Sequence, residues 1–63
     1  MARIALTFEG VESAEDVNRI TTALMEMDGV EEAEVGRHGA EVEGRVRREA
    51  LLRTVTALGY KAH

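Results

Sequence analysis

The sequence contains no cysteine, no proline and no tryptophan, and its 63 residues include one tyrosine and one phenylalanine. Without cysteine the chain can form neither a disulfide framework nor a zinc–thiolate site. A domain of this size buries only about 60% of the surface that its unfolded chain exposes. Its stability therefore has to come from a single apolar core, and we expect residues 1–63 to form one domain.

Basic residues are also few, because eight Lys and Arg stand against twelve Asp and Glu and give a formal net charge of −4. A protein that binds nucleic acid needs a basic face. The one basic cluster comprises Arg45, Arg47, Arg48 and Arg53, and no aromatic residues are interleaved with it to stack on bases. We therefore expect no nucleic-acid partner.

Long hydrophobic runs are absent as well. No run approaches the length that crosses a bilayer, and the N-terminus lacks the apolar core of a signal peptide. We expect a soluble cytoplasmic protein with no membrane partner.

The pattern of apolar residues predicts six elements. Strands are indicated at Arg3–Phe8, Val30–Val35, Ala40–Val46 and Tyr60–His63, and helices from Ser13 to Met27 and from Arg48 to Leu58. Ser13 and Asp16 have the spacing of a helix N-cap and its partner, and Gly29 and Gly59 close the two helices. The four residues 36–39 form a glycine-flanked hairpin turn.

The order β-α-β-β-α-β predicts the α+β class and a ferredoxin-like sandwich. In this fold a four-stranded antiparallel sheet of strand order 4-1-3-2 carries both helices on one face.

Several segments together carry a family resemblance over almost the whole chain. They are Glu9-Gly10, Met27-Asp28-Gly29-Val30, Ala40-Glu41-Val42-Glu43-Gly44, Glu49-Ala50-Leu51 and Leu58-Gly59-Tyr60-Lys61-Ala62. In order and spacing this sequence resembles the heavy-metal-associated domains of bacterial copper chaperones, mercury-binding proteins and metal-pumping ATPases. The resemblance implies the ferredoxin-like fold and a metal site in the first loop.

That family's site motif is a methionine, one residue, a cysteine, two residues and a second cysteine. The corresponding positions hold Val11, Ser13 and Asp16. Thiolates suit soft ions such as Cu(I), whereas a hydroxyl and a carboxylate are hard ligands. We therefore expect no soft-metal site, and no cofactor, in this loop.

The resemblance also matches Tyr60 to a tyrosine beside the family's metal loop. One interpretation is a retained docking surface formed by Val11, Glu12, Ser13, Asp16 and Tyr60. The other, which we favour for Tyr60 itself, is a ring packed on the first helix with its hydroxyl at the surface.

The leading hypothesis is a non-enzymatic module that docks another protein. The chain offers no nucleophile–base pair and little volume for a substrate pocket. The alternative is a weak divalent-metal site with oxygen and nitrogen ligands from Glu12, Asp16 and His63. Capping explains Glu12, Glu15 and Asp16 better, because acidic residues are stabilised at a helix N-terminus, which itself disfavours cations.

We expect the hairpin tip with His38 to lie away from the first loop, and both histidines to be solvated. A four-residue turn would set Glu34 directly against Glu41, with Arg3 beside Glu43, so that the Glu34–Glu41 pair is poorly compensated. This acidic face could receive a basic partner or prevent aggregation, but a merely solvated face is the simpler reading.

Self-association through the strand that carries Glu31, Glu32 and Glu34 is a further alternative. Three glutamates disfavour edge pairing, so we expect a monomer. A small-molecule regulatory domain of similar topology stays open, although the sequence shows no ligand signature.

Overall fold

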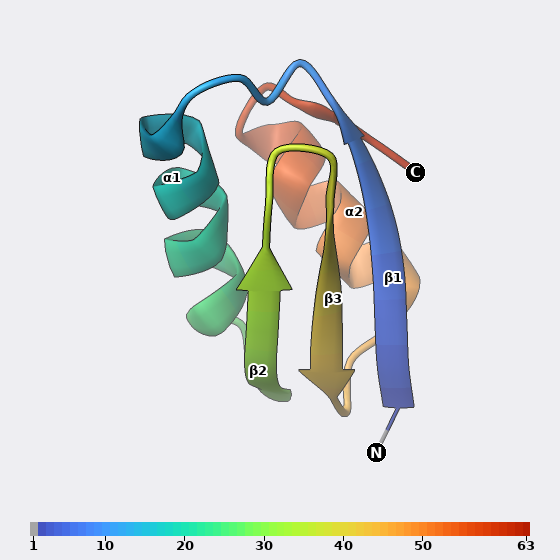
Figure 1. Cartoon of the computed structure of the whole chain (residues 1–63). Coiled ribbons are helices and arrows are strands. Elements are labelled where there is room, and N and C mark those ends of the chain that lie inside the picture. Colours follow the sequence, from blue (N-terminus) through green and yellow to red (C-terminus); the bar gives the residue numbers. More distant parts are fainter. Residues whose placement is uncertain (1) are drawn as a thin grey trace.

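The computed structural model describes residues 2–63 and shows the predicted order of elements. These are β1 (Ala2–Glu9), α1 (Ala14–Met25), β2 (Val30–Val35), β3 (Gly39–Gly44), α2 (Arg48–Ala57) and β4 (Lys61–Ala62). The strands form one antiparallel sheet of order β2-β3-β1-β4, which is the predicted order read from the other edge. Both helices lie on one face of this sheet (Figure 1).

The core forms where the apolar side of the sheet meets the two helices. Alternation along β1 turns Leu6 and Phe8 inward, and Val42 on β3 is completely buried. The helices contribute Ile20, Leu24, Leu51 and Val55, at helical spacing. The apolar sides of β1, α1 and α2 therefore meet in one core.

Some boundaries differ from the prediction because the backbone turns earlier than the apolar pattern indicates. The β3 strand ends at Gly44 rather than Val46, since Gly44 has a φ of 151° and the Arg45 N–H donates to the Gly29 carbonyl at 2.8 Å. A Cβ on Gly44 would collide with that same carbonyl. Glycine is thus required at this crossing of chains.

The other differences are small. Helix α1 ends at Met25 with Glu26 as its C-cap, α2 ends at Ala57, and β4 has two residues rather than four.

Three connections gather at one end of the molecule, which we call the loop end: residues 10–13, the turn at 36–38 and the turn at 58–60 (Figure 1). The expectation that the hairpin tip lies away from the first loop is wrong. Because β1 and β3 run antiparallel, β3 starts where β1 finishes, and the Phe8 N–H donates to the His38 carbonyl at 2.8 Å. Glu12 and Val17 line one hollow together with Gly36 and Arg37.

Candidate functional site: the first loop

The first loop is closed by a reciprocal pair of hydrogen bonds. The Asp16 N–H donates to Ser13 Oγ at 3.1 Å, and the Ser13 N–H donates to Asp16 Oδ2 at 3.3 Å. The Glu12 N–H also reaches Asp16 Oδ2, at 3.4 Å. This is a capping box, so the predicted N-cap role of Ser13 is confirmed.

Tyr60 completes this arrangement from the far end of the chain. Its hydroxyl donates to Asp16 Oδ1 at 2.6 Å, and its ring packs against the core. The favoured interpretation expected a packed ring with its hydroxyl at the surface, and the structure shows the ring against the core and the hydroxyl in a half-buried bond to Asp16. Both carboxylate oxygens of Asp16 are therefore engaged by groups of the protein itself. We call Ser13, Asp16 and Tyr60 the loop network.

The loop network shifts the acid–base equilibria of its two titratable members in opposite directions. The Tyr60 hydrogen bond, followed by the Ser13 N–H, holds the pKa of Asp16 below its ordinary value. The same bond to Asp16 raises the pKa of Tyr60, because the hydrogen bond stabilises the neutral phenol together with the ionised carboxylate.

Val11 and Glu12 are neighbours in the first loop and differ in exposure. Val11 is 7% exposed and belongs to the core cluster, whereas Glu12 is exposed. The burial of Val11 corrects the expectation that its side chain forms part of a contact surface. The Val11 side chain packs in the core under the first loop.

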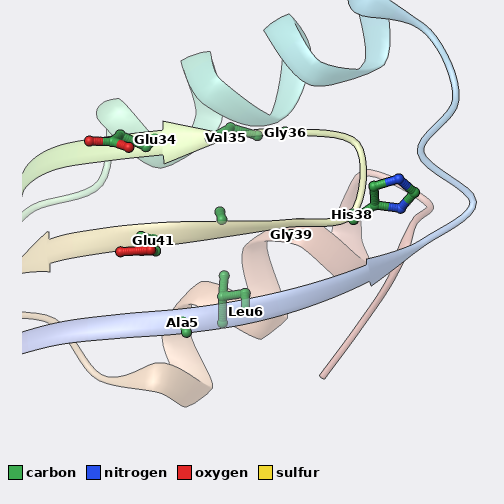
Figure 2. Close-up of a pocket in the computed structure, with 9 residues that line it drawn as sticks. Ala5, Leu6, Glu34, Val35, Gly36, His38, Gly39 and Glu41 are labelled. Atoms are coloured by element: carbon green, nitrogen blue, oxygen red, sulfur yellow. The ribbon is translucent and has the colours of Figure 1, made fainter.

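The residues of the alternative metal site are not assembled into one. His63 Nε2 lies 3.5 Å from Glu9 Oε2, and Asp16 is committed to the loop network. Within residues 2–63 no group of three or more His, Asp or Glu side chains is placed to hold a metal ion. His38 is exposed at the hairpin turn (Figure 2).

The outer face of the sheet carries the predicted pairing of like charges. Glu34 lies opposite Glu41, and the two line an open hollow of about 540 Å³ together with Ala5, His38 and Gly39 (Figure 2). Arg3 lies opposite Glu43, as expected.

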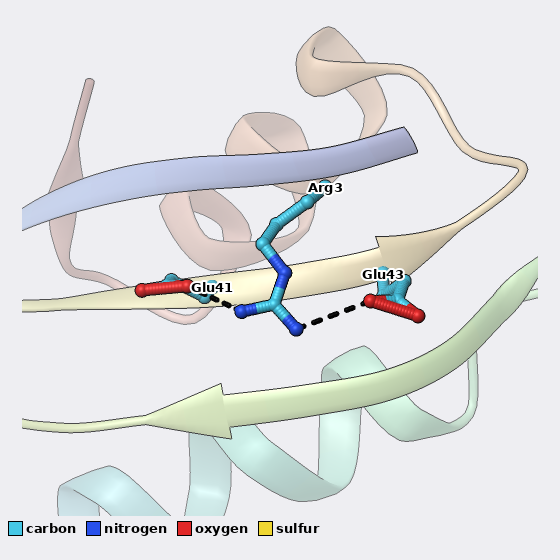
Figure 3. Close-up of polar contacts among 3 residues, drawn as sticks. All are labelled: Arg3, Glu41 and Glu43. Atoms are coloured by element: carbon cyan, nitrogen blue, oxygen red, sulfur yellow. Dashed lines mark hydrogen bonds and ion pairs between the residues drawn. The ribbon is translucent and has the colours of Figure 1, made fainter. Parts of the chain in front are cut away.

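The guanidinium of Arg3 is shared between two glutamates. Arg3 Nη1 bonds Glu41 at 2.8 Å, and Nη2 bonds Glu43 at 3.1 Å (Figure 3). The Glu34–Glu41 pair, expected to be poorly compensated, is therefore compensated at its Glu41 member. The two carboxylates raise the pKa of Arg3.

Sequence reasoning missed the bond between Tyr60 and Asp16, which are 44 residues apart. Local spacing carries no signal for this contact. The predicted strand order did contain a signal for this contact. Because β4 pairs with β1, the start of β4 lies at the loop where β1 ends.

Comparisons with known proteins show which solved structures share this fold. No family model and no curated protein sequence matches the chain. Among solved structures, a copper-binding domain of HMA7, a P-type ATPase, is 26% identical with a TM-score of 0.95, over 100% of this chain and 92% of that one.

The N-terminal domain of a potential copper-translocating P-type ATPase from Bacillus subtilis, in its Cu(I)-loaded state, is 29% identical with a TM-score of 0.88, over 95% of this chain and 81% of that one. The CopZ metallochaperone, 21% identical, shares the fold with a TM-score of 0.92, over 98% of this chain and 100% of its own.

These neighbours are metal-binding domains and a metallochaperone, in agreement with the expectation of a non-enzymatic protein. No helix in residues 2–63 is long and apolar enough to cross a membrane. The resemblance to heavy-metal-associated copper-binding domains and copper chaperones is thus confirmed in structure, for a chain that lacks the two cysteines of their motif.

Proposed function

We propose that this chain is a protein-docking module on the heavy-metal-associated scaffold, and that its first loop serves contact rather than soft-metal transfer. The observation that carries this proposal is the loop network. Ser13 and Asp16 stand at the two cysteine positions implied by the resemblance, and they bond each other and Tyr60. A loop held by its own hydrogen bonds needs no ion to keep its shape.

The proposed contact surface consists of Glu12, Ser13, Asp16 and Tyr60, with Val11 beneath it. Glu12 and Ser13 are its exposed members, while Asp16 and Tyr60 are half-buried and fix the geometry. A preordered loop loses less conformational freedom on binding than a mobile one, which favours association. The partner we propose is another cytoplasmic protein.

Site-specific photo-crosslinking in the cells that express the protein tests this assignment. A photoreactive phenylalanine analogue replaces Glu12 in one variant and Arg53, an exposed residue of α2, in the control. We expect one discrete adduct from position 12 and none from position 53. No adduct at position 12, or the same adducts from both positions, would overturn the docking assignment.

The alternative of an oxygen and nitrogen metal site needs a different readout. Titration with Zn(II), Mn(II) and Ca(II), followed by amide NMR shifts, separates the two functions. Tight binding with shifts centred on Glu12 and Asp16 would replace the docking proposal with metal carriage.

A further inference from the structure

The edge of β1 that faces β4 is covered over only part of its length. Strand β4 has two residues, which pair with Phe8 and Glu9, and its pairing is extended by reciprocal bonds between Thr7 and His63 at 2.7 and 2.9 Å. Within residues 2–63, strand pairing on this side stops at Thr7. We call the uncovered stretch, residues 3–5, the open edge.

The register shows which backbone groups point outward there. Thr7 directs its N–H and C=O toward His63, whereas the Phe8 N–H points the other way, to His38. In an antiparallel strand these directions alternate, so Arg3 and Ala5 direct their backbone groups toward the open edge. The Ala5 carbonyl accepts from Arg48, and the Ala5 N–H together with the backbone groups of Arg3 is a template on which an extended segment can pair.

A cation lies on this edge. Arg48, in the first turn of α2, donates from its guanidinium to the Ala5 carbonyl. Arg3 is on the other face of the sheet, where Glu41 and Glu43 neutralise it. None of the ion pairs described for residues 2–63 includes Arg48, so the charge that it places at the open edge is positive and lies on the helix side of the sheet.

We propose that the open edge binds an extended acidic segment of another protein, which continues β4 along β1 and places a carboxylate beside Arg48. This surface is separate from the first loop, because β1 runs from the open edge toward the loop end (Figure 1). Backbone pairing to Arg3 and to the Ala5 N–H supplies the attachment, and Arg48 supplies the preference for acidic side chains.

The test titrates the isotope-labelled protein with a short peptide of alternating threonine and glutamate, with a threonine–lysine peptide as its counterpart. We expect the acidic peptide to shift the Arg3 and Ala5 amide signals and to slow the hydrogen exchange of Ala5. The lysine peptide should bind about fivefold more weakly or not at all, as the loss of an exposed ion pair implies. Equal effects of the two peptides would overturn the proposal.

Ala5→Pro removes an outward N–H and should abolish the shift that the acidic peptide causes in the Arg3 amide signal. Ala33→Pro is the matched control, because Gly36 donates to Gly39 and Glu34 pairs with Glu41, which directs the Ala33 N–H to the opposite edge of the sheet. Circular dichroism checks that both variants fold. Unchanged binding by folded Ala5→Pro would contradict the proposal.

Arg48→Glu provides a readout that does not depend on proline, since it should reverse the preference toward the lysine peptide. Retention of the acidic preference would overturn the role of Arg48. Self-association through Arg3 and Ala5 without peptide would assign the open edge to a second copy and equally overturn the proposed partner.

Discussion

At the scale of single residues, Asp16 is the side chain on which the shape of the first loop depends. It accepts hydrogen bonds from the backbone N–H groups of Glu12 and Ser13 and from the Tyr60 hydroxyl. An ionised carboxylate accepts all of them, whereas a protonated one loses acceptor capacity. The loop network should therefore respond to pH.

Asp16→Asn should weaken the acid dependence of stability. The folded-state pKa of Asp16 lies below its ordinary value of about 3.8, so its contribution is present above that pH and is lost as pH falls through the lower folded value. We expect the variant to be less stable than the wild type at pH 7 and the difference to shrink below about pH 4. Urea unfolding followed by circular dichroism at several pH values measures this difference. A constant difference across the acid range would contradict it.

Tyr60 offers a direct optical test of the same bond, because it is the only tyrosine of a chain without tryptophan. Its pKa is raised above the ordinary value of 10.0, so the stabilisation is present below pH 10.0 and is lost as pH rises through the folded value. A titration of phenolate absorbance should have its midpoint above pH 10.0 in the wild type. In Asp16→Asn the midpoint should move back toward the ordinary value, while Glu15→Gln, next to it in α1, should leave it unchanged. A wild-type midpoint at 10.0 would exclude the bond in solution.

At the scale of elements, the β2–β3 hairpin contains an electrostatic conflict that the turn length imposes. Glu34 lies opposite Glu41, and Glu32 opposite Glu43. Only the β3 members bond to Arg3 among the described ion pairs of residues 2–63. The β2 glutamates therefore add repulsion along the sheet edge, which discourages edge-to-edge pairing.

Glu34→Lys should relieve this conflict and stabilise the domain by about 0.5 kcal/mol, the scale of a cross-strand charge pair. Glu15→Lys is the control with the opposite sign, because it replaces a favourable acidic residue in the first turn of α1. Thermal unfolding at low salt compares the two variants. A loss of stability in Glu34→Lys would show that repulsion at this pair is negligible.

The helices and strands could be predicted where a periodic pattern of apolar residues is bounded by a capping or turn residue. Ile20 and Leu24 at helical spacing after the Ser13 cap identified α1, and alternation with Leu6 and Phe8 identified β1. The end of β3 could not be predicted, because the conformation of Gly44 is set by close contact with the Gly29 carbonyl. That carbonyl is a neighbour in space but distant in the sequence.

At the scale of the whole molecule, the strand order could be predicted but not all of its consequences. The order β2-β3-β1-β4 already implies that His38 and Tyr60 share one end with the first loop. The Tyr60–Asp16 bond and the shared guanidinium of Arg3 depend on side-chain reach across strands, and local sequence patterns carry no information about it.

The scaffold also bears on what distinguishes this chain from its structural neighbours. With TM-scores of 0.95 and 0.88 to copper-binding ATPase domains, its backbone follows theirs, and its lack of cysteine is a difference of side chains. Two substitutions should then restore a soft-metal site, since thiolates at positions 13 and 16 supply the ligands that Cu(I) prefers.

A competitive Cu(I) titration against a chromogenic chelator, with the wild type and Ser13→Cys/Asp16→Cys side by side, tests whether the first loop of this chain can hold a soft metal ion. We expect the wild type to leave the chelator's Cu(I) in place and the double variant to withdraw about one equivalent, as a two-thiolate site should. Withdrawal of Cu(I) by the wild type would contradict this expectation, because a loop network closed by its own hydrogen bonds has no soft ligand to offer.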